Sequence, residues 1–533
     1  MAACGFHSPD AGPPDTPPVA AEVHFVSVTA SEAMLRPGLY GMEVTAVLRN
    51  ELATEITGIR ASLTFRDGTA DRAADFWWRD FDARDGVTAP QPASIPPGAE
   101  ATFRFRVDAL AHAVGPGPIL LDGEATFQVD GSTRAATPLD PPASLPFAAG
   151  GAPIVVTVSA DEDNGDSNIS FREAVKLANA NPGFDRIVFS PVVFPAGSPT
   201  NVPLSTTLGE LPPVNGDLVI DGSGANVVLT VDASWRGTQH YGLRLQGGVL
   251  VIQGLSFRDL GEGYPVEDVS TNNCGTGGPH DGGAIRVDGG TLVLDGNHFA
   301  DPSVSERNCY AASLRLEGGN GHRILNNTWT DQAMDSMSIN AATLEVSGNT
   351  MDSSFNPNKA DDCIVIQSQR GSDLWIVGNL CVDPEFSGIL ASGTDAGKLY
   401  VVNNTFARSR NGNGVSRGNG RRTELHNNVY YANQPAAIMP DAGGSNLDIS
   451  YEAAFGNGVF CTAGCPSATI TMSLISSGVD LGLMNPAGIT RADFTPRSTA
   501  PLVDSGLDLV DRNGSAPGRF NGAGPERGAV ELP

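Results

Sequence analysis

The feature that most constrains this chain is a short pattern that recurs between about residues 242 and 430: a strand, then an Asn, then an apolar residue two places later. Its six copies are Asn297-His-Phe299, Asn327-Thr-Trp329, Asn349-Thr-Met351, Asn379-Leu-Cys381, Asn404-Thr-Phe406 and Asn428-Val-Tyr430. Successive Asn residues lie 30, 22, 30, 25 and 24 positions apart. A strand-rich repeat of this length is typical of a parallel β-helix, in which each repeat is one coil of a solenoid.

Each repeated Asn is expected at a sharp bend between two sheets. Asn tolerates the left-handed backbone conformation that such a bend requires. Its side-chain amide can both donate and accept a hydrogen bond, so Asn residues stacked on successive coils should form a ladder along the axis. The sequence therefore predicts an all-β solenoid that stacks in register.

Composition narrows the function classes. The 533 residues leave room for one elongated solenoid and a smaller domain. With 63 Gly, 38 Pro and only 17% charged residues, the chain is typical of turn-rich β proteins. The formal net charge, 33 − 60 = −27, disfavours binding to nucleic acid or anionic lipid. No apolar stretch approaches the roughly 20 residues that span a bilayer.

The cysteines indicate export. Apart from Cys4, the remaining six fall into pairs whose spacings suit disulfides: Cys274–Cys309, Cys363–Cys381 and Cys461–Cys465. Buried free thiols in a cytosolic protein are the alternative. Metal binding through Cys461 and Cys465 is disfavoured, because no His or further Cys lies nearby.

The start of the chain resembles the end of a bacterial lipoprotein signal, in which Cys4 would be acylated. Residues 7–20 are Pro-rich, as a tether would be. We expect residues 1–20 to be this lipoprotein-like start and tether, with simple secretion as the alternative. The expected location is extracellular or at the cell surface, for instance as an outer-membrane lipoprotein. The expected state is a monomer whose membrane contact is limited to the lipid anchor.

Residues 21–146 predict a small β-sandwich. Strands with alternating polarity are expected over 23–28, 42–48, 59–65, 101–107 and 119–129. The segment 95–103 resembles immunoglobulin-like modules of bacterial surface proteins, which serve as spacers or as carbohydrate-binding attachments. The run Phe76-Trp77-Trp78 could stack on a sugar ring or fill the sandwich core.

Residues 153–533 are expected to form the β-helix. Ser170 and Glu173 form a capping box, which predicts a helix over about 170–180 that covers one end of the solenoid. The segment 169–179 resembles the Cys-Ser-Leu-Arg-Glu-Ala motif that opens many bacterial surface β-helix proteins, with Ile169 in place of Cys and Phe171 in place of Leu.

From about residue 490, the segments 498–506 and 525–531 resemble the closing segment of those same proteins. Together the two resemblances imply a right-handed parallel β-helix of the pectate-lyase-like class. That class includes polysaccharide lyases, glycoside hydrolases, adhesins and members without a known activity, so it does not fix a function.

The strands that open successive coils align into columns. Their centres are expected to face the interior and the flanking positions to face outward; the central residues are Leu243, Ile285, Leu314, Met337 and Ile364. Arg244, Arg286 and Arg315 then form an outer column of candidate ligand-binding residues. A second outer column comprises Gln246, Asp288, Glu317, Asn340 and Gln367. With coils about 4.8 Å apart, the arginines either pair with the acids of the second column or line a groove for an acidic polymer.

Asp335 and Asp362 precede equivalent strands, and Asp361 lies beside Asp362. Carboxylates on adjacent coils could lie about 5 Å apart, as in a retaining glycosidase, or Asp335 and Asp362 could hold Ca²⁺, the one cofactor that the sequence suggests. The segment 361–366 resembles the Asp-Asp-Cys-Ile segment of the polygalacturonase family, which implies catalytic roles for these carboxylates. The other motifs of that family are matched poorly or not at all; Ser387-Gly388, for example, stands where His-Gly is expected.

Basic residues gather in one later coil: Arg408, Arg410, Arg417, Arg421 and Arg422. A lyase needs cations to neutralise a uronate and a base to remove a proton, and Arg370, Arg417 or His426 could contribute. A solvated loop is the alternative. The segment 161–166 resembles a Ca²⁺ loop, but its Gly is one place early and its twelfth position is Arg172, so a turn is expected there.

The sequence thus predicts an exported β-helix protein with a binding or structural role that contacts extracellular polysaccharide, which could be acidic. A lyase or pectinase-like hydrolase acting on a uronate polymer is the alternative. An adhesin for a protein partner is the third possibility.

Overall fold

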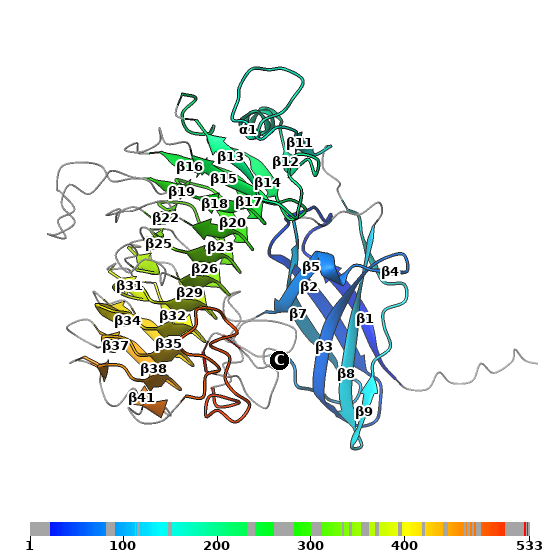
Figure 1. The fold of residues 1–533 in the computed structure, drawn as a ribbon. Coiled ribbons are helices and arrows are strands. Elements are labelled where there is room, and N and C mark those ends of the chain that lie inside the picture. Colours follow the sequence, from blue (N-terminus) through cyan, green and yellow to red (C-terminus); the bar gives the residue numbers. More distant parts are fainter. Residues whose placement is uncertain are drawn as a thin grey trace, which may run out of the picture.

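A computed structural model describes residues 22–81, 91–111, 113, 118–147, 152–205, 207–231, 240–260, 282–300, 312–332, 335–340, 344–352, 362–367, 373–392, 397–417, 422–440, 446–462, 465, 470–471, 474–475, 481–506, 527–528 and 530. They form a β-sandwich that lies alongside a parallel β-helix (Figure 1). The expected fold class is confirmed. Within these ranges, no helix is long and apolar enough to cross a membrane.

The sandwich consists of two antiparallel sheets. The first has the order β1 (Val23–Ala30), β2 (Met42–Asn50), β7 (Glu100–Ala109) and β5 (Phe76–Asp80). The second has the order β10 (Ala143–Leu145), β8 (Ile119–Val129), β3 (Ile56–Asp67) and β4 (Ala70–Asp71), with β6 (Ser94–Ile95) on β3 and β9 (Ser132–Ala135) on β8. A 3₁₀ turn, η1 (Ala73–Asp75), precedes β5.

Alternating apolar residues of both sheets fill the sandwich core, including Phe65 and Phe105. Phe76 stacks on Phe65 at 4.4 Å, and the edge of Trp78 meets Phe105 at 5.4 Å between ring centroids. Two of the three residues in the aromatic run therefore fill or line the core, while Trp77 is half-buried.

The β-helix has three parallel sheets, and each coil passes from sheet 3 to sheet 1 and then to sheet 2. Sheet 1 comprises β11 (Ile154–Val156), β12 (Phe184–Phe189), β14 (Asp217–Asp221), β17 (Val249–Gln253), β20 (Thr291–Asp295), β23 (His322–Leu325), β26 (Leu344–Ser347), β29 (Leu374–Val377), β32 (Leu399–Val402), β35 (Thr423–His426), β38 (Leu447–Ser450) and β41 (Ile470–Thr471).

Sheet 2 comprises β13 (Thr200–Leu204), β15 (Val227–Val231), β18 (Ser256–Arg258), β21 (His298–Ala300), β24 (Thr328–Thr330), β27 (Thr350–Asp352), β30 (Leu380–Val382), β33 (Thr405–Ala407), β36 (Val429–Tyr431), β39 (Ala453–Phe455) and β42 (Leu474–Ile475). Sheet 3 comprises β16 (Tyr241–Leu245), β19 (Gly283–Val287), β22 (Ala312–Leu316), β25 (Asp335–Ile339), β28 (Ile364–Ile366), β31 (Ile389–Ala391), β34 (Gly412–Arg417), β37 (Pro435–Met439) and β40 (Val459–Cys461).

The expected Asn ladder lies at the corner between sheets 1 and 2. The backbone N–H and the side-chain amide of Asn297 both donate to Oδ1 of Asn327, at 2.9 and 3.0 Å. The same pair of bonds recurs from each ladder Asn to the next as far as Asn428. All six are at most 2% exposed. Each amide also donates to a strand carbonyl, as Asn349 does to Ile324 at 2.7 Å, so the ladder satisfies buried backbone groups.

One expectation about this corner is wrong. The ladder Asn residues do not adopt the left-handed conformation; the residue before each of them does. These preceding residues are Gly296, Asn326, Gly348, Gly378, Asn403 and Asn427, with φ between 54° and 68°. The bend and the ladder thus need two adjacent residues, because the ladder side chain must point into the core while its neighbour turns the backbone.

Glu452 takes the place of Asn at the last rung that the structure describes. Asn428 donates to its Oε1 from the side chain at 3.1 Å and from the backbone at 3.3 Å. Burial raises the pKa of Glu452 to about 8, against the opposing effect of these hydrogen bonds and of Arg527. An acceptor is all that the rung requires here, and a protonated carboxyl supplies it.

A second, shorter ladder lies where sheet 2 leads back to sheet 3. Asn433 donates to Oδ1 of Asn457 at 3.0 Å and to the carbonyl of Phe406 at 2.9 Å, while the N–H of Ser409 donates to Asn433. Sequence reasoning missed it. The signal was the 24-residue spacing of Asn433 and Asn457, which equals that of the last ladder step.

Helix α1 (Phe171–Ala180) covers the first coils, at one end of the β-helix in Figure 1. The capping box of Ser170 and Glu173 is present, and Phe171 and Ala174 join the core. Arg172 holds Asp161 with two bonds of 2.8 Å and donates to the carbonyls of Gly209 and Glu210. The first and twelfth positions of the loop that resembled a Ca²⁺ site therefore pair with each other, with a guanidinium where a cation would sit.

The C-terminal segment packs on the side of the solenoid. Leu481, Leu483, Phe494 and Leu502 pack against the outer face of sheet 2, which contributes Leu380, Val382, Ala407, Val429 and Ala453. Arg408 binds both oxygens of Asp383, and its guanidinium also donates to the carbonyls of Pro486 and Gly488. Farther along, Arg527 donates to the carbonyl of Glu452 at 3.1 Å. We call residues 481–506 the strap.

The sandwich docks on the outer face of sheet 1. Val219, Val251 and Val293 follow one another along this face and pack against Ala111. Next in the same column, Arg323 binds the buried carboxylate of Asp108 at 2.6 Å. The Tyr40 hydroxyl donates to Asp295 at 3.1 Å. Tyr40, Asp108 and Ala111 belong to the sandwich, so the two domains share an interface with apolar and ionic contacts.

The cap generates a first prediction. Arg172→Ala leaves the Asp161 carboxylate, only 2% exposed, without its cation, which should lower the free energy of unfolding by about 3–5 kcal/mol. Ser170→Ala should cost about 1 kcal/mol. Denaturant unfolding, together with amide hydrogen exchange in α1, measures both. The exposed Arg134→Ala on β9 is the matched control; a loss in R172A no larger than in this control would contradict the assignment.

Glu452, at the last described rung of the Asn ladder, gives a second prediction. Unfolded Glu452 ionises near 4.5 while the folded side chain keeps its proton to about pH 8. The native state then binds more protons between these values, so this group's contribution to stability is full below about pH 4.5 and is lost as the pH rises through 8. Glu452→Gln keeps the acceptor and removes the titration. Its Tm should exceed that of the wild type at pH 8 but not at pH 4.5; equal differences at both pH values would argue against a buried proton.

Candidate functional site

Sheet 3 places the three candidate arginines as predicted. Arg244 is the register partner of Arg286, and Arg286 of Arg315. The column continues through Ser338 and Val365. The arginine side chains are 23–30% exposed, so they lie on the outer face within reach of solvent.

The second column stacks beside the first. The backbone N–H of each member donates to the preceding coil, as Asp288 does to Leu245 at 2.9 Å and Gln367 to Ile339 at 2.8 Å. Five successive coils therefore carry an amide or a carboxylate at one position: Gln246, Asp288, Glu317, Asn340 and Gln367. We call these five residues and the three arginines the polar strip.

The charges of the polar strip are paired. Asp288 accepts from Arg244 and from Arg286, both at 2.7 Å, and so bridges two coils. Arg315 pairs with Glu317, which also accepts from Asn340 at 3.3 Å. Of the two interpretations left open by the sequence, the geometry of these residues is that of a paired lattice.

Pairing also sets the ionisation of the strip. Burial alone would raise the pKa of Asp288, but the hydrogen bonds from Arg244 and Arg286 outweigh it and hold the pKa below its ordinary value. The hydrogen bond to Asp288 in turn raises the pKa of Arg244. Both partners are therefore charged across the neutral pH range.

Sequence reasoning missed Glu210 and its neighbours. The Glu210 carboxylate lies 3.5 Å from Arg244 and 3.6 Å from His240, and it accepts from the N–H of Tyr241 at 2.8 Å. The guanidinium of Arg286 lies over the Tyr241 ring. Glu210 precedes the first strand of sheet 3 and belongs to no repeat, so nothing in the periodic pattern pointed to it.

The position before each central residue faces inward, not outward as expected. Its members are buried: Ala284, Ser313, Ser336 and Cys363 are at most 4% exposed. Ala284 and Cys363 belong to the main core. The chain turns from the corner into the strand at this point, so two consecutive residues point inside and strict alternation begins only at the arginine column.

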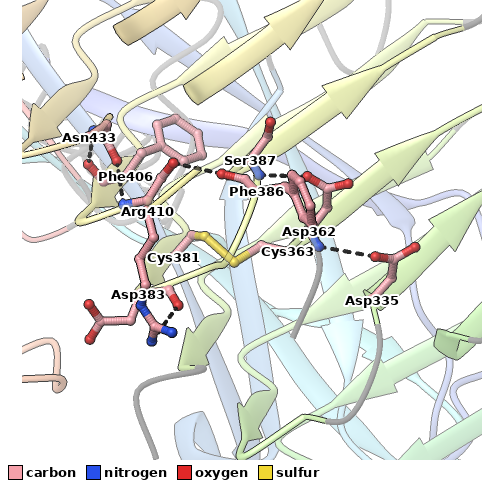
Figure 2. Close-up of a disulfide and its surroundings, with 11 residues drawn as sticks. Asp335, Asp362, Cys363, Cys381, Asp383, Phe386, Ser387, Phe406, Arg410 and Asn433 are labelled. Carbon is pink, nitrogen blue, oxygen red and sulfur yellow. Dashed lines mark hydrogen bonds between the residues drawn. A yellow bond between two sulfur atoms is a disulfide. The ribbon is translucent and has the colours of Figure 1, made fainter. Parts of the chain in front are cut away.

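Asp335 and Asp362 bind backbone groups of the next coil. Figure 2 shows Oδ1 of Asp335 accepting from the N–H of Asp362 at 3.0 Å, and Oδ1 of Asp362 accepting from the N–H of Ser387 at 2.6 Å. Asp362 is 6% exposed. The two carboxylates thus follow one another up the stack and join three coils at the edge of sheet 3. Asp361 lies outside the described residues.

Two of the three expected cysteine pairs form disulfides. Cys363–Cys381 crosses the interior between sheet 3 and sheet 2, directly beside Asp362 (Figure 2). Cys461, the last residue of β40, is bonded to Cys465. Cys4, Cys274 and Cys309 lie outside the described residues.

Those of the expected basic residues that the structure describes have separate environments and do not form one patch. Arg417 is 3% exposed and pairs in register with Ala391, in a row otherwise made of core residues such as Val287 and Leu316. Arg408 is used by the strap. Arg410 donates to the carbonyl of Asp383, and Arg422 lies 3.4 Å from Glu424. Arg370 and Arg421 lie outside the described residues.

The surroundings of His426 are those of a buried polar side chain. His426 is 4% exposed and its Nδ1 lies 2.6 Å from the Ser450 hydroxyl. Among the residues that the structure describes, no three His, Cys, Asp or Glu side chains gather where they could hold a metal ion.

No family model and no curated protein matches the sequence. The solved structures that are similar to this chain include the following two. The catalytic domain of a GH87 alpha-1,3-glucanase in complex with tetrasaccharides has 10% identity and a TM-score of 0.16, with 86% of this chain and 98% of that chain covered. Tailspike protein 3 of bacteriophage CBA120 has 14% identity and a TM-score of 0.21, with 62% of each chain covered. Neither likeness bears on the activity of this chain.

The carboxylate ladder generates a third prediction. Asp362→Ala leaves the buried N–H of Ser387 without its acceptor and should cost about 1–3 kcal/mol of unfolding free energy. Asp362→Asn keeps an oxygen at that place and should cost less. Thermal or denaturant unfolding measures the order of the two. Asp448→Ala, on an exposed position of β38, is the control. If D362A is as stable as this control, the carboxylate has no such structural role.

Proposed function

We propose that this protein binds extracellular carbohydrate through the polar strip, without turning it over. The observation that carries the proposal is the row of five amide or carboxylate side chains on successive coils, flanked by three arginines. At about 4.8 Å per coil the row extends over roughly 20 Å, the length of an extended oligomer rather than of a small molecule.

The chemistry of the row suits a polyhydroxylated chain. A sugar hydroxyl donates one hydrogen bond and accepts others, so it needs acceptors and donors side by side. Carboxylates and amide oxygens of the strip accept, while guanidinium and amide N–H groups donate. Planar side chains of this kind also form bidentate contacts with neighbouring hydroxyls.

A catalytic role for Asp335 and Asp362 has less support. Each already accepts a backbone N–H in the stack. A general acid or nucleophile must reach the substrate, whereas Asp362 is buried. In our proposal, Asp335 and Asp362 have this structural role instead. A lyase or hydrolase for uronate polymers, assisted by Ca²⁺, remains the competing hypothesis that the assay below decides.

The setting that we propose is a bacterial surface protein of the pectate-lyase-like β-helix class. It rests on the opening and closing segments, whose residues Arg172, Glu173 and Arg527 hold structural contacts in this chain. Two disulfides within the described residues favour export. Acylation of Cys4, and a monomer tethered by residues 1–20, complete this proposal.

The fourth prediction tests binding against turnover. The full chain should be retained by immobilised extracellular polysaccharides, and Arg286→Gln should weaken retention about tenfold, the loss of one charge-assisted hydrogen bond. Arg134→Gln on the sandwich should not. Retention by affinity electrophoresis is the measurement.

The same samples are assayed for reducing ends and for the absorbance of unsaturated uronate products, with Ca²⁺ present. If the wild type forms product and Asp362→Asn does not, the protein is an enzyme and the proposal of binding without turnover is wrong. Retention of a protein partner that soluble glycans do not compete away would favour an adhesin.

A further inference from the structure

Resting on the proposed function, we infer that the ligand of the polar strip is an uncharged polysaccharide rather than a uronate polymer. The inference comes from the charge balance of the strip and its immediate neighbour Glu210. Among the residues described here, three guanidinium groups, those of Arg244, Arg286 and Arg315, face three carboxylates. The carboxylates are Glu210, Asp288 and Glu317.

Every cation of the strip is already matched within its own surface. Arg244 contacts two carboxylates, Arg286 shares Asp288 with it, and Arg315 has Glu317. An incoming carboxylate would either displace one of these acids from its arginine or bind to a guanidinium that an acid already neutralises. In both cases it would lie next to that acid as a like charge at short range.

The surroundings add negative charge. Asp335 and Asp362 lie at the start of the next strands of the same sheet. Over the whole chain the net charge is −27. An acidic polymer is therefore disfavoured both at contact distance and by the long-range field.

An uncharged sugar chain meets neither penalty. Its hydroxyls can accept from guanidinium N–H groups and donate to the carboxylate oxygens of Asp288 and Glu317. A guanidinium has five N–H groups and a carboxylate about four acceptor positions, so the ion pairs can persist while the ligand binds. The paired strip acts as a fixed array of donors and acceptors that needs no rearrangement.

The test compares two classes of probe on the intact protein. Affinity electrophoresis is run with dextran, galactomannan and laminarin as uncharged probes, and with polygalacturonate and alginate as acidic probes, at 20 and 500 mM NaCl. We expect retention by at least one uncharged polymer, unchanged by salt because no net charge is neutralised, and none by the acidic polymers.

Other outcomes separate this inference from the proposed function. Retention by acidic polymers only, or equally by both classes, overturns the uncharged ligand but leaves carbohydrate binding standing. Retention by none of the five overturns both.

A charge variant makes the test sharper. Asp288→Asn keeps the shape and leaves Arg244 and Arg286 without their shared acid, so the strip and Glu210 together change from a balance of charges to a net positive charge. We expect retention by polygalacturonate to appear, sensitive to salt, and retention by the uncharged polymer to fall about tenfold. Glu317→Gln should likewise raise retention by polygalacturonate and lower retention by the uncharged polymer. Asp448→Asn, the same change on the exposed face of sheet 1, is the control. If D288N leaves the ratio between the two probe classes at the control value, the inference is wrong.

Discussion

The structure depends on hydrogen bonds between successive coils at the corner of sheets 1 and 2. There a single amide both continues the ladder to the next coil and satisfies a strand carbonyl of the preceding coil, as Asn349 does for Asn379 and Ile324. Because the ladder is buried, a rung of different length or chemistry would leave a donor without a partner. This requirement fixes the register of all three sheets, and the register places the polar strip in line.

Several charged side chains away from water are satisfied in a similar way, by a partner on another segment. Several buried or half-buried arginines are matched to an acid, and each matched pair joins two different segments of the chain. The pairs are Arg172–Asp161 at the cap, Arg323–Asp108 between the domains and Arg408–Asp383 under the strap. Removing one member would leave an unpaired charge away from water, so these pairs specify how the parts fit together more than they add to stability. The polar strip on sheet 3 has the same kind of arginine–carboxylate pairing on a surface that solvent reaches.

The sequence predicted the features that follow from the repeat of the coils, and it missed the features that depend on tertiary contacts. The ladder residues, the column of Arg244, Arg286 and Arg315, and helix α1 all follow from spacing and were located correctly. The inward-facing row that contains Cys363 was not located correctly, because the turn into each strand shifts the alternation of inward and outward side chains there. Arg417 was assigned to a ligand surface, yet its register with Ala391 places it in an interior row. No local pattern reveals that a strand carries its charge inward.

The candidate site was predictable only in part, for a physical reason. Pairing of Arg244 with Asp288 follows from the two-residue offset between columns, but Glu210 arrives from outside the repeat and completes the charge balance. Sheet 1 meets the sandwich through Val219, Val251, Val293 and Arg323, and sheet 2 meets the strap through the residues around Leu380. Sheet 3, in contrast, presents a row whose arginines keep about a quarter of their side chains exposed. Polar side chains that are held in fixed pairs and still open to solvent are the basis of the binding role that we propose. The balance of charge between the row and Glu210 is the basis of the proposed preference for uncharged chains.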